Sequence, residues 1–216
     1  MSGEDIFAAR RLLRAQHGAA LATLSQKLAG HPFATGVDYF TDYAAEPVFL
    51  ISALAEHTKN LAADPRVSLL VQGASSDIQA SPRLTLVGEA TGVTETEAAS
   101  LKTRYLRYFP EAATYFELDF FFCRIEPQHL RYVGGFGAAR WIAPGDFLAK
   151  ASGWQEAEDA LITQFGSANT PLIGLDCDGF DLRDGNRIQR VDFAAPLEDP
   201  AQAVNALSAA TKNLPG

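Results

Sequence analysis

The sequence is poor in sulfur and has no long apolar run. Its two cysteines, Cys123 and Cys177, lie far apart in apolar, strand-like segments. This pattern argues against a disulfide framework and a thiolate metal site, so we expect two buried free thiols in a reducing compartment. The longest apolar segment, around residues 47–55, is too short to span a bilayer, and residues 1–7 do not resemble a secretory signal. These absences predict a cytoplasmic protein with no membrane partner.

Basic residues are also scarce. The chain has 18 lysines and arginines against 26 acidic residues, which gives a formal net charge of -8. No nucleic-acid partner is expected, because phosphate backbones attract clustered Lys and Arg. A few local basic groups could still hold a small anionic ligand. The 216 residues allow one large domain, or a medium domain with a small appendage, and either can bury a self-sufficient core.

Motifs for metal-dependent or nucleophilic catalysis are missing as well. Four histidines are scattered along the chain: His17, His31, His57 and His129. None has a partner at ligand spacing, which disfavours a zinc or non-haem iron site but leaves room for a single axial ligand of haem. No Gly-x-Ser-x-Gly elbow occurs, and Asp176 and Asp178 are better explained as turn formers than as an acid–base pair. We therefore name no catalytic residue and no metal ligand.

Short β-like runs dominate the first two thirds of the chain, after an amphipathic helix expected over residues 6–16. The expected strands are residues 19–25, 33–40, 47–54, 66–72, 84–94, 116–126 and 128–133. Two helices interrupt them, at residues 56–63 and at residues 95–108, the second with Thr94 as its N-cap. Since no strand–helix rhythm repeats, the pattern favours an antiparallel barrel or sandwich over a doubly wound parallel sheet.

The pattern of expected helices and strands changes at Pro144-Gly145. Beyond it we expect a helix over residues 154–165, three short strands at residues 172–176, 180–183 and 187–193, and a last helix with Asp199 as its N-cap and Pro200 as its first residue. The sequence thus predicts a β-rich domain of residues 1–143, followed by a small α+β module of residues 144–216.

The most informative local feature is a polar cluster where the strand at residues 47–54 meets the helix at residues 56–63: Ser52, His57, Thr58, Lys59 and Asn60. Side-chain donors and the unpaired N–H groups of a helix start point the same way there, which favours an anion. An ordinary turn, with Thr58 and Asn60 solvated and His57 half-buried, explains the cluster equally well. Anion donors without an acid, base or nucleophile suggest that a bound cofactor carries the chemistry, and a phosphorylated flavin fits.

Five motifs, in order along nearly the whole chain, carry a family resemblance: Ser52-x-Leu54-Ala55-x-His57-Thr58-x-Asn60, Asp64-Pro65-Arg66-Val67-Ser68-Leu69, Pro82-Arg83-Leu84-Thr85-Leu86-x-Gly88, Gly134-Gly135-Phe136-Gly137-x-Ala139 and Asp176-x-Asp178-Gly179-Phe180-Asp181-Leu182-Arg183. In these motifs the chain resembles the pyridoxamine 5′-phosphate oxidase-like superfamily of FMN-binding split β-barrels, and more closely its haem-utilisation (HugZ-type) branch. The resemblance implies a mainly β (α+β) fold, in which a split β-barrel is followed by a small α+β C-terminal module. It also implies a homodimer with the flavin sites at the subunit interface.

Carried over position by position, the resemblance implies an FMN site made of Thr35, Gly36, Val37, Leu50, Ile51, Ser52, His57, Thr58 and Arg83. Residues 35–37 and 50–52 would lie along the isoalloxazine ring and the ribityl chain. His57 stands where the oxidases have a phosphate-binding lysine, Arg83 where they have a flavin-contacting glutamine, and Thr35 where they have an arginine. His57, Thr58 and Arg83 are therefore expected to hold the phosphate.

Three functional hypotheses follow, and whether the chain is an enzyme stays open. The first is FMN binding with a flavin-dependent oxidoreductase role, but not pyridoxamine phosphate oxidation, because the substrate-binding Arg and His pattern of the oxidases is not recognisable. The alternative is haem binding or haem breakdown, with propionates near Arg131 or Arg140. The helix at residues 154–165 has none of the histidines common in that branch, so His17 or His129 would have to supply the iron ligand. The third is a cofactor-free regulatory adaptor.

Overall fold

The computed structural model describes residues 3–74, 77–135, 138–165 and 171–211. These residues belong to two compact units, which divide between Leu148 and Ala149. The domain boundary expected after residue 143 stays a prediction. No helix among the described residues is both long and apolar enough to span a membrane. The expected cytoplasmic location likewise stays a prediction.

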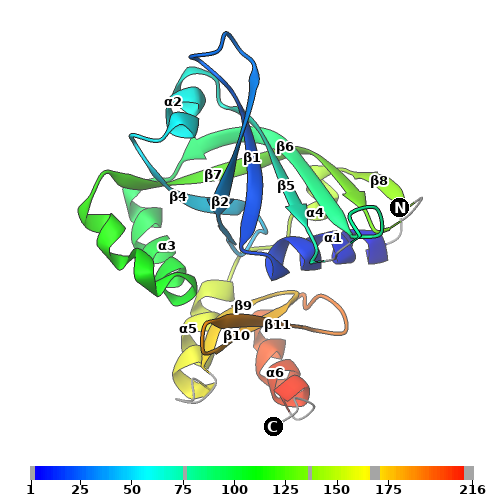
Figure 1. Cartoon of the computed structure of the whole chain (residues 1–216). Coiled ribbons are helices and arrows are strands. Elements are labelled where there is room, and N and C mark those ends of the chain that lie inside the picture. Colours follow the sequence, from blue (N-terminus) through cyan, green and yellow to red (C-terminus); the bar gives the residue numbers. More distant parts are fainter. Residues whose placement is uncertain (1–2, 75–76, 136–137, 166–170, 212–216) are drawn as a thin grey trace. The chain divides into compact units, whose positions relative to one another are not determined.

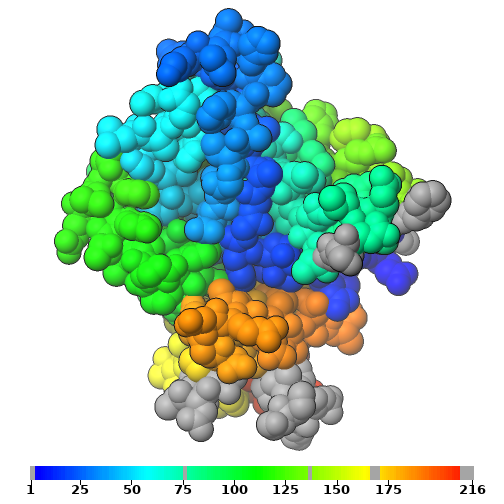
Figure 2. Space-filling model, in the orientation of Figure 1, coloured from blue at the N-terminus to red at the C-terminus, as the bar shows by residue number. Residues whose placement is uncertain are grey.

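The first unit is built around one antiparallel sheet. Its elements are α1 (Gly3–Ala15), β1 (Gly18–Leu24), β2 (Pro32–Asp38), β3 (Phe40–Thr41), β4 (Pro47–Ser52), α2 (Glu56–Ala63), β5 (Arg66–Gln72), β6 (Arg83–Gly92), α3 (Glu95–Tyr108), the 3₁₀ helix η1 (Pro110–Glu117), β7 (Phe120–Val133), β8 (Ala139–Ile142) and α4 (Pro144–Phe147). The strand order is β2-β1-β5-β6-β7-β4-β3, and β8 pairs with β7. The sheet curls into a half barrel (Figure 1), which confirms the mainly β, split-barrel fold class. Figure 2 shows the β1–β2 hairpin, in blue, with its turn projecting from the barrel.

The core of this unit lies on the inner face of the curled sheet. Alternate residues of the central strands point inward, and Leu69 in β5 and Leu84 and Leu86 in β6 are fully buried. Helix α1 packs Leu13 against this layer, and α4 adds Phe147. Burial of each such side chain stabilises the fold by roughly 1.5–3 kcal/mol relative to exposure. The amphipathic pattern at residues 6–16 therefore predicted the helix, although Arg10 and Arg14, which were expected to face solvent, are buried as well.

Helix α3 covers the outer face at one end of the sheet. Thr94 caps it as predicted, because its hydroxyl accepts the N–H of Glu97 while the Glu97 carboxylate accepts the N–H of Thr94. Aromatic rings join this helix and η1 to β7, with centroids 5.5 Å apart between Tyr105 and Phe122 and 5.6 Å apart between Phe116 and Phe122. The outer face at the start of β7 is thus buried under aromatic side chains.

The structure corrects the elements predicted around β7. The sequence predicts strands at residues 116–126 and 128–133 with a bend at Pro127. Instead, residues 110–117 form η1, and a single strand runs from Phe120 to Val133. Pro127 has no N–H to give to the ladder, and a β-bulge accommodates it. The sequence pattern did not predict β8, which follows the motif that begins at Gly134; Phe136 and Gly137 of that motif lie outside the described residues.

The bulge brings the backbones of β6 and β7 close together. Gly88 pairs with Pro127 and Val87 with His129, so Gln128 is the extra residue. A Cβ atom on Gly88 would lie 2.0 Å from the carbonyl oxygen of Glu126. Only glycine fits at this position without movement of the backbone.

The second unit is the predicted small α+β module. It contains α5 (Trp154–Phe165), β9 (Leu172–Asp176), β10 (Gly179–Asp184), β11 (Arg187–Asp192), the 3₁₀ helix η2 (Pro200–Gln202) and α6 (Ala203–Thr211), with the strands in the order β11-β10-β9. Asp199 is an N-cap as predicted, since its carboxylate accepts the N–H of Ala201, but it caps the 3₁₀ helix η2, and the final α-helix begins only at Ala203. Trp154 and Phe180 are buried in its core.

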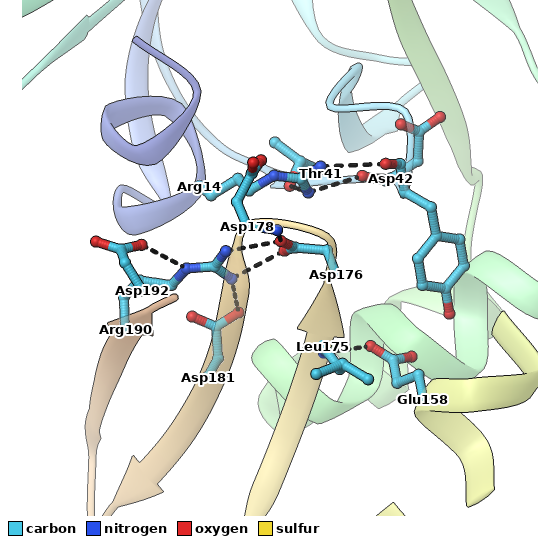
Figure 3. A network of polar contacts seen from close by, with 11 residues as sticks. Arg14, Thr41, Asp42, Glu158, Leu175, Asp176, Asp178, Asp181, Arg190 and Asp192 are labelled. Carbon is cyan, nitrogen blue, oxygen red and sulfur yellow. Dashed lines mark hydrogen bonds and ion pairs between the residues drawn. The ribbon is translucent and has the colours of Figure 1, made fainter. Parts of the chain in front are cut away.

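A buried ion network joins the three strands of this unit (Figure 3). Arg190 donates from Nη2 and Nη1 to the two carboxylate oxygens of Asp176, at 2.7 and 2.8 Å. Its Nη1 and Nε each lie 3.2 Å from a further carboxylate oxygen, of Asp181 and Asp192 respectively. Asp176 also accepts the N–H of Asp178, the hydrogen bond expected of a turn-forming residue. Charge compensation by Arg190 allows these acids to be buried.

Replacement of Gly88 by alanine tests the close approach at the bulge. We expect G88A to lower the free energy of unfolding by about 1–3 kcal/mol, because the added methyl group would force the β6 and β7 backbones apart. Gly92 in the same strand is the matched control, since a Cβ atom there would meet nothing within 4 Å. Urea unfolding of both variants measures the difference. Equal stability of G88A and G92A would contradict the role of the contact.

Candidate functional site

Strands β5, β6, β7 and β8 lie side by side in the sheet (Figure 1). We call the grid of side chains on their outer surface the β5–β8 face. Antiparallel partners point to the same side of a sheet, so the strand pairings define its rows. The rows are Gln72, Arg83, Val133 and Ala139; Leu70, Thr85, Arg131 and Trp141; and Ser68, Val87 and His129. The face mixes cationic side chains with exposed apolar ones, since Leu70 is 39%, Val87 37% and Trp141 59% exposed.

A hollow of about 310 Å³ lies at one end of the β5–β8 face. It is lined by Gln79, Arg83, Thr85, Arg131, Val133, Gly135, Ala138 and Ala139. Arg83 and Arg131 occupy diagonal positions on neighbouring strands, which places their Cα atoms about 7–8 Å apart. Two guanidinium groups therefore line a single hollow.

Neither guanidinium forms an ion pair with a described residue. Arg83 donates from Nη1 to the carbonyl oxygens of Ile78 and Ser81, at 3.3 and 3.4 Å, so one of its nitrogens is anchored and the others can serve a ligand. The guanidinium carbon of Arg131 lies 5.2 Å from the ring centroid of Trp141 in a cation–π contact. The hollow thus presents two oriented cations on an acidic chain, which suits a ligand with carboxylate or phosphate groups.

The other predicted flavin contacts lie elsewhere, along β2, β4 and the start of α2: Thr35, Gly36, Val37, Leu50, Ile51, Ser52, His57 and Thr58. The structure brings Thr35 and His57 together, with 3.4 Å between the threonine Oγ1 and the imidazole Nδ1. Ile51 is buried in the barrel core, and Val37 packs against that core. These residues form a second group, separate from the arginine-lined hollow.

The surroundings of His57 disfavour a charged imidazole. Burial lowers its pKa below the ordinary value, and its Nε2 is buried without a hydrogen-bond partner among the described residues. A neutral imidazole adds no positive charge to a phosphate site. The hydroxyl of Thr58 is engaged as well, because it donates to the carbonyl oxygen of Ser52 at 2.7 Å.

Two other members of the polar cluster, Ser52 and Asn60, already hydrogen-bond to groups of the chain. The Oγ of Ser52 lies 3.2 and 3.3 Å from the two carboxylate oxygens of Asp119, and this negative charge opposes a phosphate at the start of α2. Asn60 is fully buried, donating to the Oγ1 of Thr23 and accepting the N–H of Gln26. It was expected to be solvated if the cluster were an ordinary turn. Instead, its two hydrogen bonds connect α2 to β1 and to the turn that follows β1.

Arg83 lies far from this second group along the sheet. The register pairs Ser52 with Phe120 at the start of β7 and Arg83 with Val133 at its end. Within one chain, Arg83 therefore does not meet His57 or the start of α2. A shared phosphate site would need a second copy of the chain, as in the expected homodimer, and the FMN contacts stay predictions.

A second hollow, of about 370 Å³, lies between α3, η1 and the start of β7. Its lining residues are Gly92, Val93, Glu95, Ala98, Ala99, Lys102, Phe116, Phe120, Phe121 and Phe122. The Nζ of Lys102 lies 4.4 Å from the ring centroid of Phe116. This hollow is mainly apolar, and it lacks the converging pair of cations found in the first.

The acids of the β9–β10 turn resemble a metal site only superficially. Ligand atoms of Asp176, Cys177 and Asp178 lie within 4.8 Å of one another, but Asp176 already pairs with Arg190. Their interpretation as turn residues fits this arrangement. Both cysteines are buried and free, as predicted. Burial raises the pKa of Cys123 to about 11, so this thiol is protonated and unreactive at neutral pH.

One further ionisable cluster surrounds Arg124 on β7. Its Nε lies 3.4 Å from Asp42 and 3.5 Å from Glu46, and its Nη1 donates to Glu97 in α3 at 3.1 Å. Burial and the neighbouring charge of Asp42 raise the pKa of Glu46 to about 7, although Arg124 opposes the shift. Shifted pKa values often mark functional sites, but here the groups link α3, β7 and the residues before β4. We interpret this cluster as structural.

From the sequence, Arg83 and Arg131 were expected to contact different ligands, and the hollow that both residues line was not predicted. The contact of Trp141 with Arg131 was not predicted either. The available signal was the alternation of polar and apolar residues near the end of β7, but the partner strand and its register could not be derived from it. The hollow exists because of cross-strand pairing, which no single segment reveals.

Fold and sequence together define the class of protein. The model of the family described as "CREG, beta-barrel" matches residues 4–149. The chain therefore belongs to the CREG β-barrel family. This confirms the resemblance to the pyridoxamine phosphate oxidase-like split barrels, whose fold it shares.

Three relatives illustrate the similarity. The chloroplastic non-canonical heme oxygenase HOZ of Arabidopsis thaliana is 36% identical over 156 residues, which are 72% of this chain and 47% of HOZ, so the chain spans about half the length of this relative. The protein Atu2129 of Agrobacterium tumefaciens, of unknown function, superposes with a TM-score of 0.81 at 26% identity, covering 95% of this chain and 94% of the other. A heme binding protein from Mycobacterium smegmatis superposes with a TM-score of 0.62 at 26% identity, covering 98% and 97%.

The raised pKa of Glu46 predicts a pH-dependent stability. Between its ordinary pKa of 4.5 and about 7, the folded protein holds a proton that the unfolded chain has released. The free energy of unfolding should therefore fall as pH rises through this window. E46Q removes this loss, and after allowance for solvent screening we expect the variant to be more stable than the parent at pH 8 by on the order of 1 kcal/mol.

Urea unfolding at pH 5 and pH 8 measures the effect. The exposed Glu117 supplies the control, E117Q, which should change stability equally at both pH values. If E46Q and the parent protein differ by the same amount at pH 5 and pH 8, the assigned shift is wrong.

Proposed function

We propose that this protein binds haem on the β5–β8 face and belongs functionally with the haem oxygenase-like proteins. The observation that carries the proposal is the pair of unneutralised guanidinium groups, Arg83 and Arg131, beside an exposed apolar surface. Two relatives support it, since one is a heme oxygenase and another a heme binding protein. Because the chain spans about half of the first relative, that relative supports haem binding more directly than it supports haem breakdown.

The donor set of the β5–β8 face fits haem. Arg83 and Arg131 can each bind a propionate through paired N–H groups, in the geometry that guanidinium and carboxylate share. Leu70, Val87 and Trp141 offer apolar and aromatic surface to the porphyrin ring. When bound, haem would supply the iron-centred oxygen chemistry, while the protein binds and orients it. The residues of this face therefore serve to position the group.

FMN is the less well supported cofactor. At the start of α2, where its phosphate was expected, burial disfavours a charged His57, and the carboxylate of Asp119 lies next to Ser52. Arg83, the one cation of the predicted site, lies at the opposite end of β7. A flavin site of the expected kind depends on the proposed homodimer, whereas the arginine-lined hollow is formed by one chain.

Substitution of the two arginines tests the proposal. We expect R83A and R131A each to weaken binding of ferric haem by about 10- to 100-fold, because a hydrogen bond to a charged group contributes roughly 1.5–3 kcal/mol. R140A is the control of equal charge: Arg140, the alternative propionate contact expected from the sequence, is exposed but pairs with the inward-facing Tyr132, so it projects from the other side of the sheet from Trp141. Absorbance titration of the purified variants gives the three dissociation constants.

Parallel titrations with FMN, followed by desalting, separate the competing functions. Retention of haem by the parent protein, with loss in R83A and R131A but not in R140A, would support the proposal. Equal effects of all three substitutions would contradict the assigned site. Retention of FMN in place of haem would favour the flavin hypothesis, and retention of neither would favour the adaptor.

A further inference from the structure

We propose that His129 is the axial ligand of the haem iron, an inference that rests on the proposed haem binding. The imidazole side chain belongs to β7, whose next outward residue is Arg131. A neutral imidazole nitrogen is a common ligand of haem iron. His129 would add an iron ligand to a surface that already offers groups for the propionates and the ring.

The other three histidines are placed less favourably. His17 packs beside the rings of Tyr108 and Phe109, with centroids 5.2 and 6.3 Å away. His57 has a buried Nε2, and its Nδ1 contacts Thr35. His31 is exposed, but it directly precedes β2 at the projecting turn of the β1–β2 hairpin. None of these three belongs to the rows of the β5–β8 face.

His129 is exposed and available. It makes no hydrogen bond, ion pair or ring contact with any residue that the structure describes. Its cross-strand partner is Val87, itself 37% exposed. The ring therefore stands beside an apolar side chain, with neither nitrogen engaged in a contact within the described chain.

The spacing on β7 suits the centre and one edge of a haem molecule. Two residues along a strand span about 6.6–6.8 Å, which is the separation expected between the backbones of His129 and Arg131. Arg83 lies one row further in the same direction, since it pairs with Val133. Both arginines therefore lie on the same side of His129, as the two carboxylates of haem lie on one edge of the porphyrin.

The exposed apolar side chains occupy the rows that such a haem would cover. Val87 shares a row with His129, while Leu70 and Trp141 share the next row with Arg131. A ring with its iron near His129 and its carboxylates toward Arg83 would remove these three side chains from water. The arrangement therefore assigns a role to each exposed apolar residue of the face.

Iron-containing and iron-free porphyrins distinguish a metal ligand from a general contact. We expect H129A and H129Q to weaken ferric haem binding by at least tenfold and to shift its Soret band and electron paramagnetic resonance spectrum. Protoporphyrin IX without iron should bind both variants within about twofold of the parent, because its carboxylates and ring still meet the same surface. R83A and R131A should weaken the binding of both porphyrins.

H31A is the matched control, because it removes an exposed histidine from a turn outside the face. It should change neither affinity nor spectrum. Added imidazole should restore the parent spectrum in H129A, which a merely structural role of His129 would not allow.

Different results would contradict haem binding and the ligand role of His129. If the parent protein binds haem and H129A keeps the parent spectrum and affinity, His129 is not the ligand, although haem binding stands. If H129A loses affinity for haem and iron-free porphyrin alike, the ligand role is also wrong. If the parent protein binds no haem, the proposed function and the ligand are overturned together.

Discussion

The outer face of the barrel depends on the one-residue bulge in β7. Before the bulge, Arg124 points outward and Ile125 belongs to the core; after it, Arg131 points outward and Leu130 belongs to the core. The extra residue, Gln128, therefore reverses the parity of the strand. Because side chains alternate with a period of two, a strand without it would turn Arg131 toward the core and Leu130 toward solvent. The arginine-lined hollow exists only with this register.

Two residues, Gly88 and Pro127, make the bulge possible because each lacks a group that a regular strand pair would have to accommodate. Gly88 lacks the Cβ atom that would meet the Glu126 carbonyl oxygen, and Pro127 lacks the N–H that a regular ladder would need to satisfy. Strand β6 pairs with β5 and β7, so a distortion between β6 and β7 lies in the middle of the sheet. Bulges bend and twist the strands that carry them. The same contact thus contributes to the curl of the barrel and to the positions of the candidate site.

The sequence predicted much of the fold because its signals are local. The Thr94 cap marked the start of α3, and the apolar alternation of residues 66–72 marked β5. The candidate site was harder, because the pairing of Arg83 and Arg131 depends on register across two strands. For His57 the two levels differ: its place in a polar motif predicts an anion contact, which stays a prediction, whereas burial lowers its pKa and so disfavours the charged imidazole. Neither register nor burial can be derived from composition or spacing.

An acidic chain can hold a dianionic porphyrin because the attraction is local. At physiological ionic strength charges are screened over about 8 Å, so the net charge of -8 acts weakly across the molecule while Arg83 and Arg131 act at contact distance. Long-range steering is then absent, and affinity must come from the surface itself. Burial of Leu70, Val87 and Trp141 under a ring would supply the apolar part, and the two guanidinium groups would fix its orientation. A phosphate at the start of α2 would instead meet the charge of Asp119 beside Ser52, which is the physical reason to prefer a porphyrin over a flavin within one chain.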